Sequence, residues 1–214
     1  MDVKLQSVTP NAEDNIVEIA RVSSSRKDKK AKPEGLINYL INHKHFSPFE
    51  HSYLTLEINT SKAIGIQLIR HRSFTFQEFS QRYQDVNKLD EMFEPIELRE
   101  QCDNNRQSST EVFNPTIKFH ATTNANEVIN GMLGAIKSLY VELLNAGVAR
   151  EQARMILPLT TKTKIFMTGS IRSWIHFLQL RDDEHAQKEI QLVAKEAKNI
   201  FKDQFPLISK ALKY

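Results

Sequence analysis

The chain of 214 residues is poor in the residue types that several common kinds of protein require. Its single cysteine cannot form a disulfide within the chain, which favours a reducing compartment. Its six glycines form neither a Gly-x-Gly-x-x-Gly dinucleotide turn nor a phosphate-binding loop, and no Gly-x-Ser-x-Gly elbow marks a serine hydrolase. No apolar run reaches the roughly 18 residues of a membrane helix, and the N-terminus lacks the apolar core of a signal peptide. We therefore expect a cytoplasmic protein without a membrane span.

What is present is the composition of an ordinary soluble domain, with 40% hydrophobic residues, 26% charged residues and a formal net charge of +3. This balance suits anionic small molecules and is weak evidence for nucleic acid. Cys102 lies in the sequence Glu-Gln-Cys-Asp-Asn-Asn, whose acidic character does not favour a reactive thiolate, so we interpret it as incidental. His43, His45 and His51 lie close together but lack a carboxylate or thiol at metal-site spacing, and we expect no metal.

Helical and strand patterns alternate along the chain, which we expect to form one domain over residues 1–214. Alternating apolar residues predict strands at 3–8, 53–58 and 163–168. Apolar stripes, with Ser61 as an N-cap and Gly147 as a helix end, predict helices at 11–20, 36–41, 61–70, 128–147, 149–157, 171–180 and 186–201. A basic loop at 26–32 and an irregular acidic excursion at about 87–126 interrupt the pattern.

The densest anion-binding chemistry lies between Arg70 and Tyr83, where arginines, hydroxyls and amides interleave with aromatic residues. Guanidinium groups bind phosphate oxygens in bidentate fashion, and hydroxyls add further donors. The alternative is an edge strand with one polar face, whose aromatic residues are packing.

Three more arginines lie in apolar surroundings, at positions 154, 172 and 181. Arg172 and Arg181 share a segment with His176 that is otherwise rich in Trp, Ile, Phe and Leu. An unpaired buried guanidinium is costly, so each must meet an anion. For one arginine alone, a structural ion pair explains the pattern. Several such sites together favour a ligand with more than one phosphate.

Four motifs in order resemble the flavin-dependent thymidylate synthase family, over residues 35–205. The most specific is Arg70-His71-Arg72 followed, after seven residues, by Ser80. The others are His45-x-x-Pro48-Phe49-Glu50-His51, Arg154-x-x-Leu157-Pro158, and Arg172-Ser173 through Arg181-x-x-x-His185-Ala186-Gln187.

The resemblance implies an α+β fold with a mixed sheet flanked by helices, and an enzyme that methylates dUMP to dTMP. Methylenetetrahydrofolate is then the carbon donor, FAD the redox cofactor and NADPH the reductant. Reduced flavin supplies the hydride and no enzyme nucleophile attacks uracil, which agrees with the interpretation of Cys102. The family also implies homotetramers with shared active sites, no nucleic-acid or membrane partner, and a cytoplasmic location (the host's cytoplasm for a virus-encoded chain).

Matching positions give the site residues that the resemblance implies. Arg181 is the catalytic residue, which faces uracil and stabilises the charge that develops when N3 ionises. The dUMP contacts are Gln67, Arg70, Glu78, Phe79, Ser80, Gln81, Arg82, Arg154 and Arg181. The FAD contacts are His45, Ser47, Arg70, His71, Arg72, Glu78, Ser170, Ile171, Arg172, His176 and His185.

Alternatives remain for individual residues and for the whole chain. Ser80 has no adjacent base in the sequence, so we interpret it as a phosphate ligand rather than a nucleophile. His51 and His71 are otherwise structural, and His185 otherwise caps the last helix. Gln77, Thr75 and His176 depart from the residues usual in the family, which are Asn, Ser and Asn. The competing function is a non-catalytic nucleotide- or nucleic-acid-binding protein that uses the arginines as a phosphate clamp.

Overall fold

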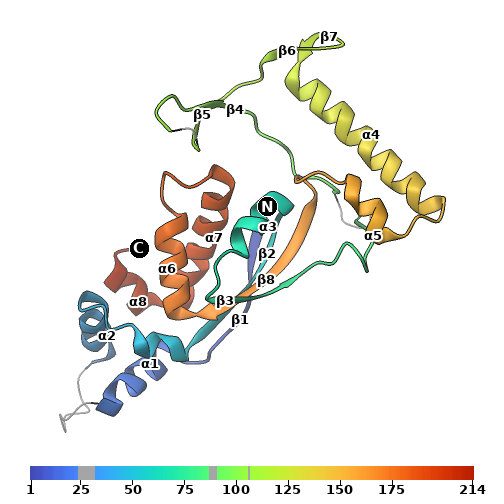
Figure 1. Cartoon of the computed structure of the whole chain (residues 1–214). Helices are drawn as coiled ribbons and strands as arrows, with labels where there is room; N and C mark the ends of the chain where they lie inside the picture. The colour runs from blue at the N-terminus through green and yellow to red at the C-terminus, as the bar shows by residue number, and fades with distance from the viewer. Residues whose placement is uncertain (24–31, 87–90, 106) are drawn as a thin grey trace. The chain divides into compact units, whose positions relative to one another are not determined.

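A computed structural model of the chain describes residues 1–23, 32–86, 91–105 and 107–214 (Figure 1). Nearly all of the expected basic loop (26–31 of 26–32) and the start of the expected excursion (87–90) lie outside these ranges. The described chain divides into two compact units. Unit 1 comprises Met1, Asn59–Ile66 and Glu78–Lys164, and unit 2 comprises Asp2–Ile58, Gln67–Gln77 and Ile165–Tyr214.

Helices and strands follow each other in a mixed order, which confirms the α+β fold class. The α-helices are α1 (Ala12–Ala20), α2 (Pro33–Asn42), α3 (Lys62–Leu68), α4 (Ala125–Asn145), α5 (Arg150–Ala153), α6 (Ile171–Arg181), α7 (Lys188–Gln204) and α8 (Pro206–Leu212). The strands are β1 (Asp2–Val8), β2 (Tyr53–Ser61), β3 (Phe74–Glu78), β4 (Arg99–Gln101), β5 (Ser109–Val112), β6 (Thr116–Phe119), β7 (Ala121–Asn124) and β8 (Lys162–Ser170). Short 3₁₀ helices are η1 (Arg21–Ser23), η2 (Ser47–His51) and η4 (Arg154–Ile156).

One four-stranded sheet, with strand order β1-β2-β8-β3, forms the centre of the fold. β2 and β8 alternate buried with partly buried residues, as the period of two in their sequences predicts. In unit 2, α6 and α7 lie side by side (Figure 1), and α7 packs against β1. Trp174 on α6 is fully buried and donates from Nε1 to the carbonyl of Leu54 on β2 at 2.9 Å.

β3 lies at one edge of this sheet, so the segment that looked like an anion cradle is in part the edge strand of the alternative interpretation. Phe74 is buried, and its ring meets Trp174 at 4.9 Å and Phe177 at 6.1 Å between centroids, in edge-to-face geometry. Phe74, the first of the alternate aromatic residues, therefore anchors the strand to α6.

Gly169 on β8 leaves the room that the Phe74 ring occupies. A Cβ added at this glycine would overlap Cδ1 and Cε1 of that ring. We expect Gly169→Ala to destabilise the protein by about 1–3 kcal/mol, because the ring must move within a packed aromatic cluster. Thermal unfolding measures this. Gly35→Ala in α2 is the matched control, since its Cβ would meet nothing within 4 Å, and we expect no loss there. Equal midpoints for the two variants would contradict the explanation.

Unit 1 corrects the interpretation of residues 87–126 as irregular. It holds two antiparallel hairpins, β4–β5 and β6–β7, whose strands are short and mostly exposed. Short polar strands carry little periodic signal, which is why the sequence did not reveal them. The expected helix at 149–157 is also wrong in its extent, because α5 covers only four residues and a 3₁₀ turn follows it.

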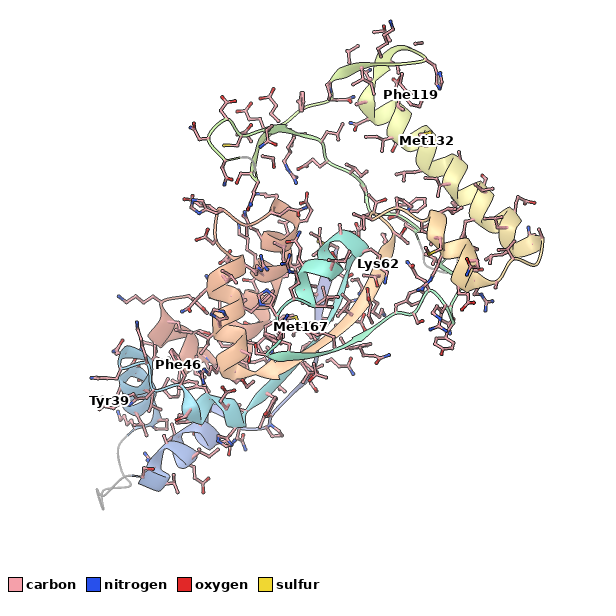
Figure 2. All side chains as sticks on the ribbon, in the orientation of Figure 1. Tyr39, Phe46, Lys62, Phe119, Met132 and Met167 are labelled. Atoms are coloured by element: carbon pink, nitrogen blue, oxygen red, sulfur yellow. The ribbon has the colours of Figure 1, made fainter. Side chains whose placement is uncertain are left out.

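α4 confirms the long helix, and its end is the one predicted. Gly147 has φ of +85°, and the N–H groups of Gly147 and Val148 donate to the carbonyls of Leu144 and Leu143, which is a Schellman motif. Only Ala125 and Tyr140 of the helix are buried. Met132, labelled in Figure 2, and Leu139 are about half exposed, at 49% and 51%. Much of the apolar stripe therefore lies uncovered by the described chain.

In the part of the chain that the structure describes, no helix is both long and apolar enough to cross a membrane.

Candidate active site

A cavity of about 550 Å³ opens in unit 2 beside one face of α6. Arg172, Ile175, His176 and Gln179 line it, and their spacing of three and four residues places them on the same side of the helix. The helix was expected to be buried nearly all round. Six of its residues are buried, but Arg172, His176 and Gln179 are exposed and form this polar wall, and Leu180 near the end of the helix is exposed as well. The remaining lining residues are Phe46, Glu50, Ser73 and Ser173.

Glu50, in η2, joins two of the predicted FAD contacts at the edge of this cavity. Its Oε1 accepts from Arg172 at 3.0 Å, and its Oε2 accepts from the hydroxyl of Ser170 at 2.6 Å. Ser170 is the N-cap of α6, and its Oγ accepts from the N–H of Ser173. The structural ion pair considered for Arg172 is thus present. Because the pair is partly exposed, its main effect is to fix the guanidinium in place rather than to stabilise the fold.

Arg181, the last residue of α6, meets an imidazole instead of a carboxylate. Its Nε donates to Nε2 of His71 at 2.9 Å. Burial, and then the charge of nearby Arg70, lower the pKa of Arg181, which nevertheless stays cationic at neutral pH. Burial, and then the charges of Arg181 and His176, lower the pKa of His71 to about 4. His71 is therefore neutral at pH 7, and this cluster carries net positive charge.

The other predicted contacts in unit 2 are distributed around these two groups. His45 and Ser47 are exposed at the start of the motif that contains η2, and Arg70 and Arg72 are exposed on either side of His71. Ile171 is fully buried and its N–H donates to the carbonyl of Ser52, so its side chain belongs to the core. His185 bonds Asp183 at 2.7 Å in the turn before α7, so it does not cap that helix. The hydrogen bond to Asp183 raises the pKa of His185.

Gln67 is part-buried at the end of α3 and donates to Oε1 of Gln187 at 2.6 Å, within unit 2. α3 itself begins as predicted, because the N–H of Ile64 donates to Ser61 Oγ. It ends at Leu68, so Arg70 lies two residues beyond the helix rather than at its last turn.

The remaining predicted dUMP contacts form a separate group in unit 1. Gln81 is 7% exposed, and its buried Nε2 has no hydrogen-bond partner in the described chain. Ser80 is half-buried beside it. Arg154 is half-buried in η4, and none of the described residues forms an ion pair with it. Arg82 is exposed and lies 3.7 Å from Glu151. The Gln81 amide and the Arg154 guanidinium, which lack such partners in the described chain, suit an external anion.

Two members of this group are already engaged by the protein. Glu78 accepts at Oε1 from Lys62 Nζ at 2.9 Å and from Thr163 Oγ1 at 2.8 Å. Phe79 packs on a small core that is centred on Tyr140 and Met92. Both residues hold the Ser80–Arg82 turn to the rest of unit 1, which gives them a structural part in any site here.

Across residues 1–23, 32–86, 91–105 and 107–214, no three His, Cys, Asp or Glu side chains are grouped so that they would bind a metal ion.

Comparison with known proteins identifies the family. The family model described as "Thymidylate synthase complementing protein" matches residues 4–207. The chain belongs to the flavin-dependent thymidylate synthase family. A probable flavin-dependent thymidylate synthase of Paramecium bursaria Chlorella virus 1 is 40% identical over 99% of both chains. The flavin-dependent thymidylate synthase of Synechocystis sp. is 38% identical over 100% of both chains. That of Thermosipho melanesiensis is 37% identical over 89% of this chain and 81% of its own length.

Membership in the flavin-dependent thymidylate synthase family confirms the resemblance that the motifs indicated. Sequence reasoning nevertheless missed six residues of the cavity wall: Phe46, Glu50, Ser73, Ser173, Ile175 and Gln179. Three of them left a signal. Glu50 and Ser173 lie within quoted motifs, and Gln179 lies one turn beyond His176 on the face that carries Arg172.

Proposed function

We propose that the chain catalyses the reductive methylation of dUMP to dTMP, with methylenetetrahydrofolate as carbon donor, FAD as redox cofactor and NADPH as reductant. The names of the relatives support a flavin-dependent thymidylate synthase. The observation that carries the proposal is the environment of Arg181. This half-buried cation has a neutral partner in His71 and no carboxylate partner among the described residues. An anion from outside the described residues would stabilise a cation in this setting.

The cavity of unit 2 suits FAD. Its volume lies in the range of roughly 300–1,000 Å³ that small-molecule sites occupy. Arg172 supplies a guanidinium that Glu50 holds in place, and Ser73 and His176 add polar groups to the wall. His45, Ser47, Arg70, Arg72 and His185 are proposed as further contacts. Bound FAD would take electrons from NADPH and supply the hydride that completes the methyl group.

The donors of unit 1 suit the phosphate and sugar of dUMP. An anion at Gln81 and Arg154 would satisfy a buried amide N–H that has no partner, and a guanidinium that has no ion pair, among the described residues. Ser80 and Arg82 belong to the same turn and add a hydroxyl and a second guanidinium. Ser80 has no hydrogen bond to a base within the described chain, which supports a ligand's role rather than that of a nucleophile.

Ser80→Ala tests this assignment. We expect dUMP to bind about 10- to 150-fold more weakly, because one hydrogen bond to a charged group is lost, while dTMP formation continues at saturating dUMP. Equilibrium dialysis and steady-state kinetics measure the two effects. Loss of all turnover with unchanged dUMP affinity would make Ser80 a nucleophile.

Arg181 is proposed to act on the uracil ring. A fixed cation beside the ring stabilises the negative charge that develops when N3 ionises, and this charge activates C5 toward the one-carbon unit. The guanidinium is anchored through Nε, so its two terminal NH₂ groups are the donors that face the substrate. No proton needs to leave the arginine, since it acts by charge alone.

A homotetramer with shared active sites is proposed for the assembled enzyme. The exposed apolar side chains of α4, together with Phe119 at the end of β6 (Figure 2), support association with further copies. Light scattering tests this, and the expected mass is about four times the 24.7 kDa of one chain. A cytoplasmic location is proposed with it, and fractionation of cells that express the chain tests that point.

The decisive experiment follows tritium release from dUMP labelled at C5, with methylenetetrahydrofolate and NADPH present. We expect a yellow protein whose flavin absorbance bleaches with NADPH, and tritium release that matches dTMP formed. A colourless protein that FAD cannot reconstitute, yet binds nucleotides, would favour the phosphate-clamp alternative.

A further inference from the structure

We propose that His71 is the positioning residue for Arg181, and that it works because it offers a hydrogen-bond acceptor without a negative charge. The inference rests on the proposed function. It assigns to His71 a role that differs from direct contact with FAD, since its Nε2 atom accepts from Arg181 at 2.9 Å.

The geometry fixes which proton His71 carries. Nε2 accepts from the Nε–H of Arg181, so a neutral His71 must hold its proton on Nδ1. Two rings keep the imidazole in place: Phe177 lies 5.0 Å and Phe74 6.3 Å from it between centroids. His71 as a whole residue is 9% exposed, so water competes poorly for the bond. His71 and Arg181 are 110 residues apart in the chain, and only the fold brings them together.

The charges around the pair explain why a neutral acceptor is useful. The charged or titratable groups that act on the pair are Arg70 and His176, and neither is an acid. A carboxylate at position 71 would hold the guanidinium equally well, but it would also cancel the positive field that the ionising uracil needs. A neutral imidazole leaves that field intact while removing the rotational freedom of the side chain. Protonated, it would lose the acceptor and repel Arg181.

A set of three variants separates these effects in the FAD-loaded enzyme. His71→Gln keeps a neutral acceptor. His71→Glu has nearly the same shape as the Gln variant but carries a negative charge, and His71→Leu has no acceptor. We expect kcat for dTMP formation to stay within about fivefold of the parent for Gln, and to fall about 10- to 100-fold for Leu and at least about 100-fold for Glu. Flavin absorbance per chain should remain at parental level in all three, which a role in holding FAD would not allow.

The same variants in an Arg181→Lys background supply the second measurement. Lysine has no Nε–H for His71 to bind, so the difference in kcat between the His71→Gln and His71→Leu variants should shrink to less than about twofold. If turnover is too slow to measure, the same comparison is made with the dUMP dissociation constant.

Each outcome decides the inference. The order Gln above Leu above Glu, together with loss of the difference in the lysine background, supports it. Equal losses for Gln and Leu, the same losses in both backgrounds, or a Glu variant as active as Gln would overturn it. A parent protein that forms no dTMP would overturn the proposed function and this inference with it, whereas an active parent with unaffected variants would overturn the inference alone.

Discussion

An Arg181→Ala enzyme is expected to form dTMP at least about 10²–10³-fold more slowly than the parent while it keeps its FAD. The reason is electrostatic: the variant removes a fixed cation from the place where, under the proposed function, negative charge develops, and loss of one such group costs about 3–4 kcal/mol of transition-state stabilisation. Arg181 is held by His71 and not by a carboxylate, so its charge is available to the substrate. Tritium release from labelled dUMP measures the chemistry, and the flavin spectrum measures cofactor content.

Two controls make the result specific. Arg181→Lys keeps the charge but not the geometry, and we expect an intermediate rate. Arg21→Ala removes an arginine of η1, outside the proposed site, and should leave the rate unchanged. Normal turnover in Arg181→Ala would end the assignment of this residue as catalytic, whereas loss of FAD together with activity would show that it serves cofactor binding.

Acidification is expected to destabilise the enzyme by about 3 kcal/mol through His71 alone between pH 6.5 and pH 4. The folded pKa of His71 lies near 4, and the ordinary value is 6.5. Above pH 6.5 the residue is neutral in both the folded and the unfolded state. Between the two values only the unfolded state binds the proton, so the free energy of unfolding falls as pH falls. Below pH 4 both states are protonated and the contribution levels off.

The measurement is the midpoint of thermal unfolding as a function of pH for the parent and for His71→Phe. The variant lacks the titrating group, so its midpoint should decline less steeply between pH 6.5 and pH 4, even if its stability at pH 7 is lower. His51→Phe, at an exposed histidine, serves as the matched control and should follow the parent curve. Parallel curves for the parent and His71→Phe would show that His71 titrates normally in the folded enzyme.

Local patterns predicted most of the regular elements. The strands β1, β2 and β8 and the helices α1, α2, α4, α6 and α7 all lie where alternation or an apolar stripe indicated them. The sequence also predicted the helix N-cap at Ser61 and the helix end at Gly147, because each depends on a few adjacent residues. The hairpins of residues 99–124 and the short helix α8 escaped prediction, since short or exposed elements carry little periodicity.

The sequence by itself determined the chemistry: which residues bear guanidinium, imidazole and carboxylate groups, and in what order the family motifs run. Only the tertiary structure decided which of them meet. Glu50 with Arg172, and His71 with Arg181, are more than 100 residues apart, and hydrogen bonds over such distances depend on how the strands and helices pack. Burial then decides their charge state. His71 lies between two cationic residues in an Arg-His-Arg run, yet desolvation beside Arg181 lowers its pKa and makes it the neutral partner of the cation that is proposed to be catalytic.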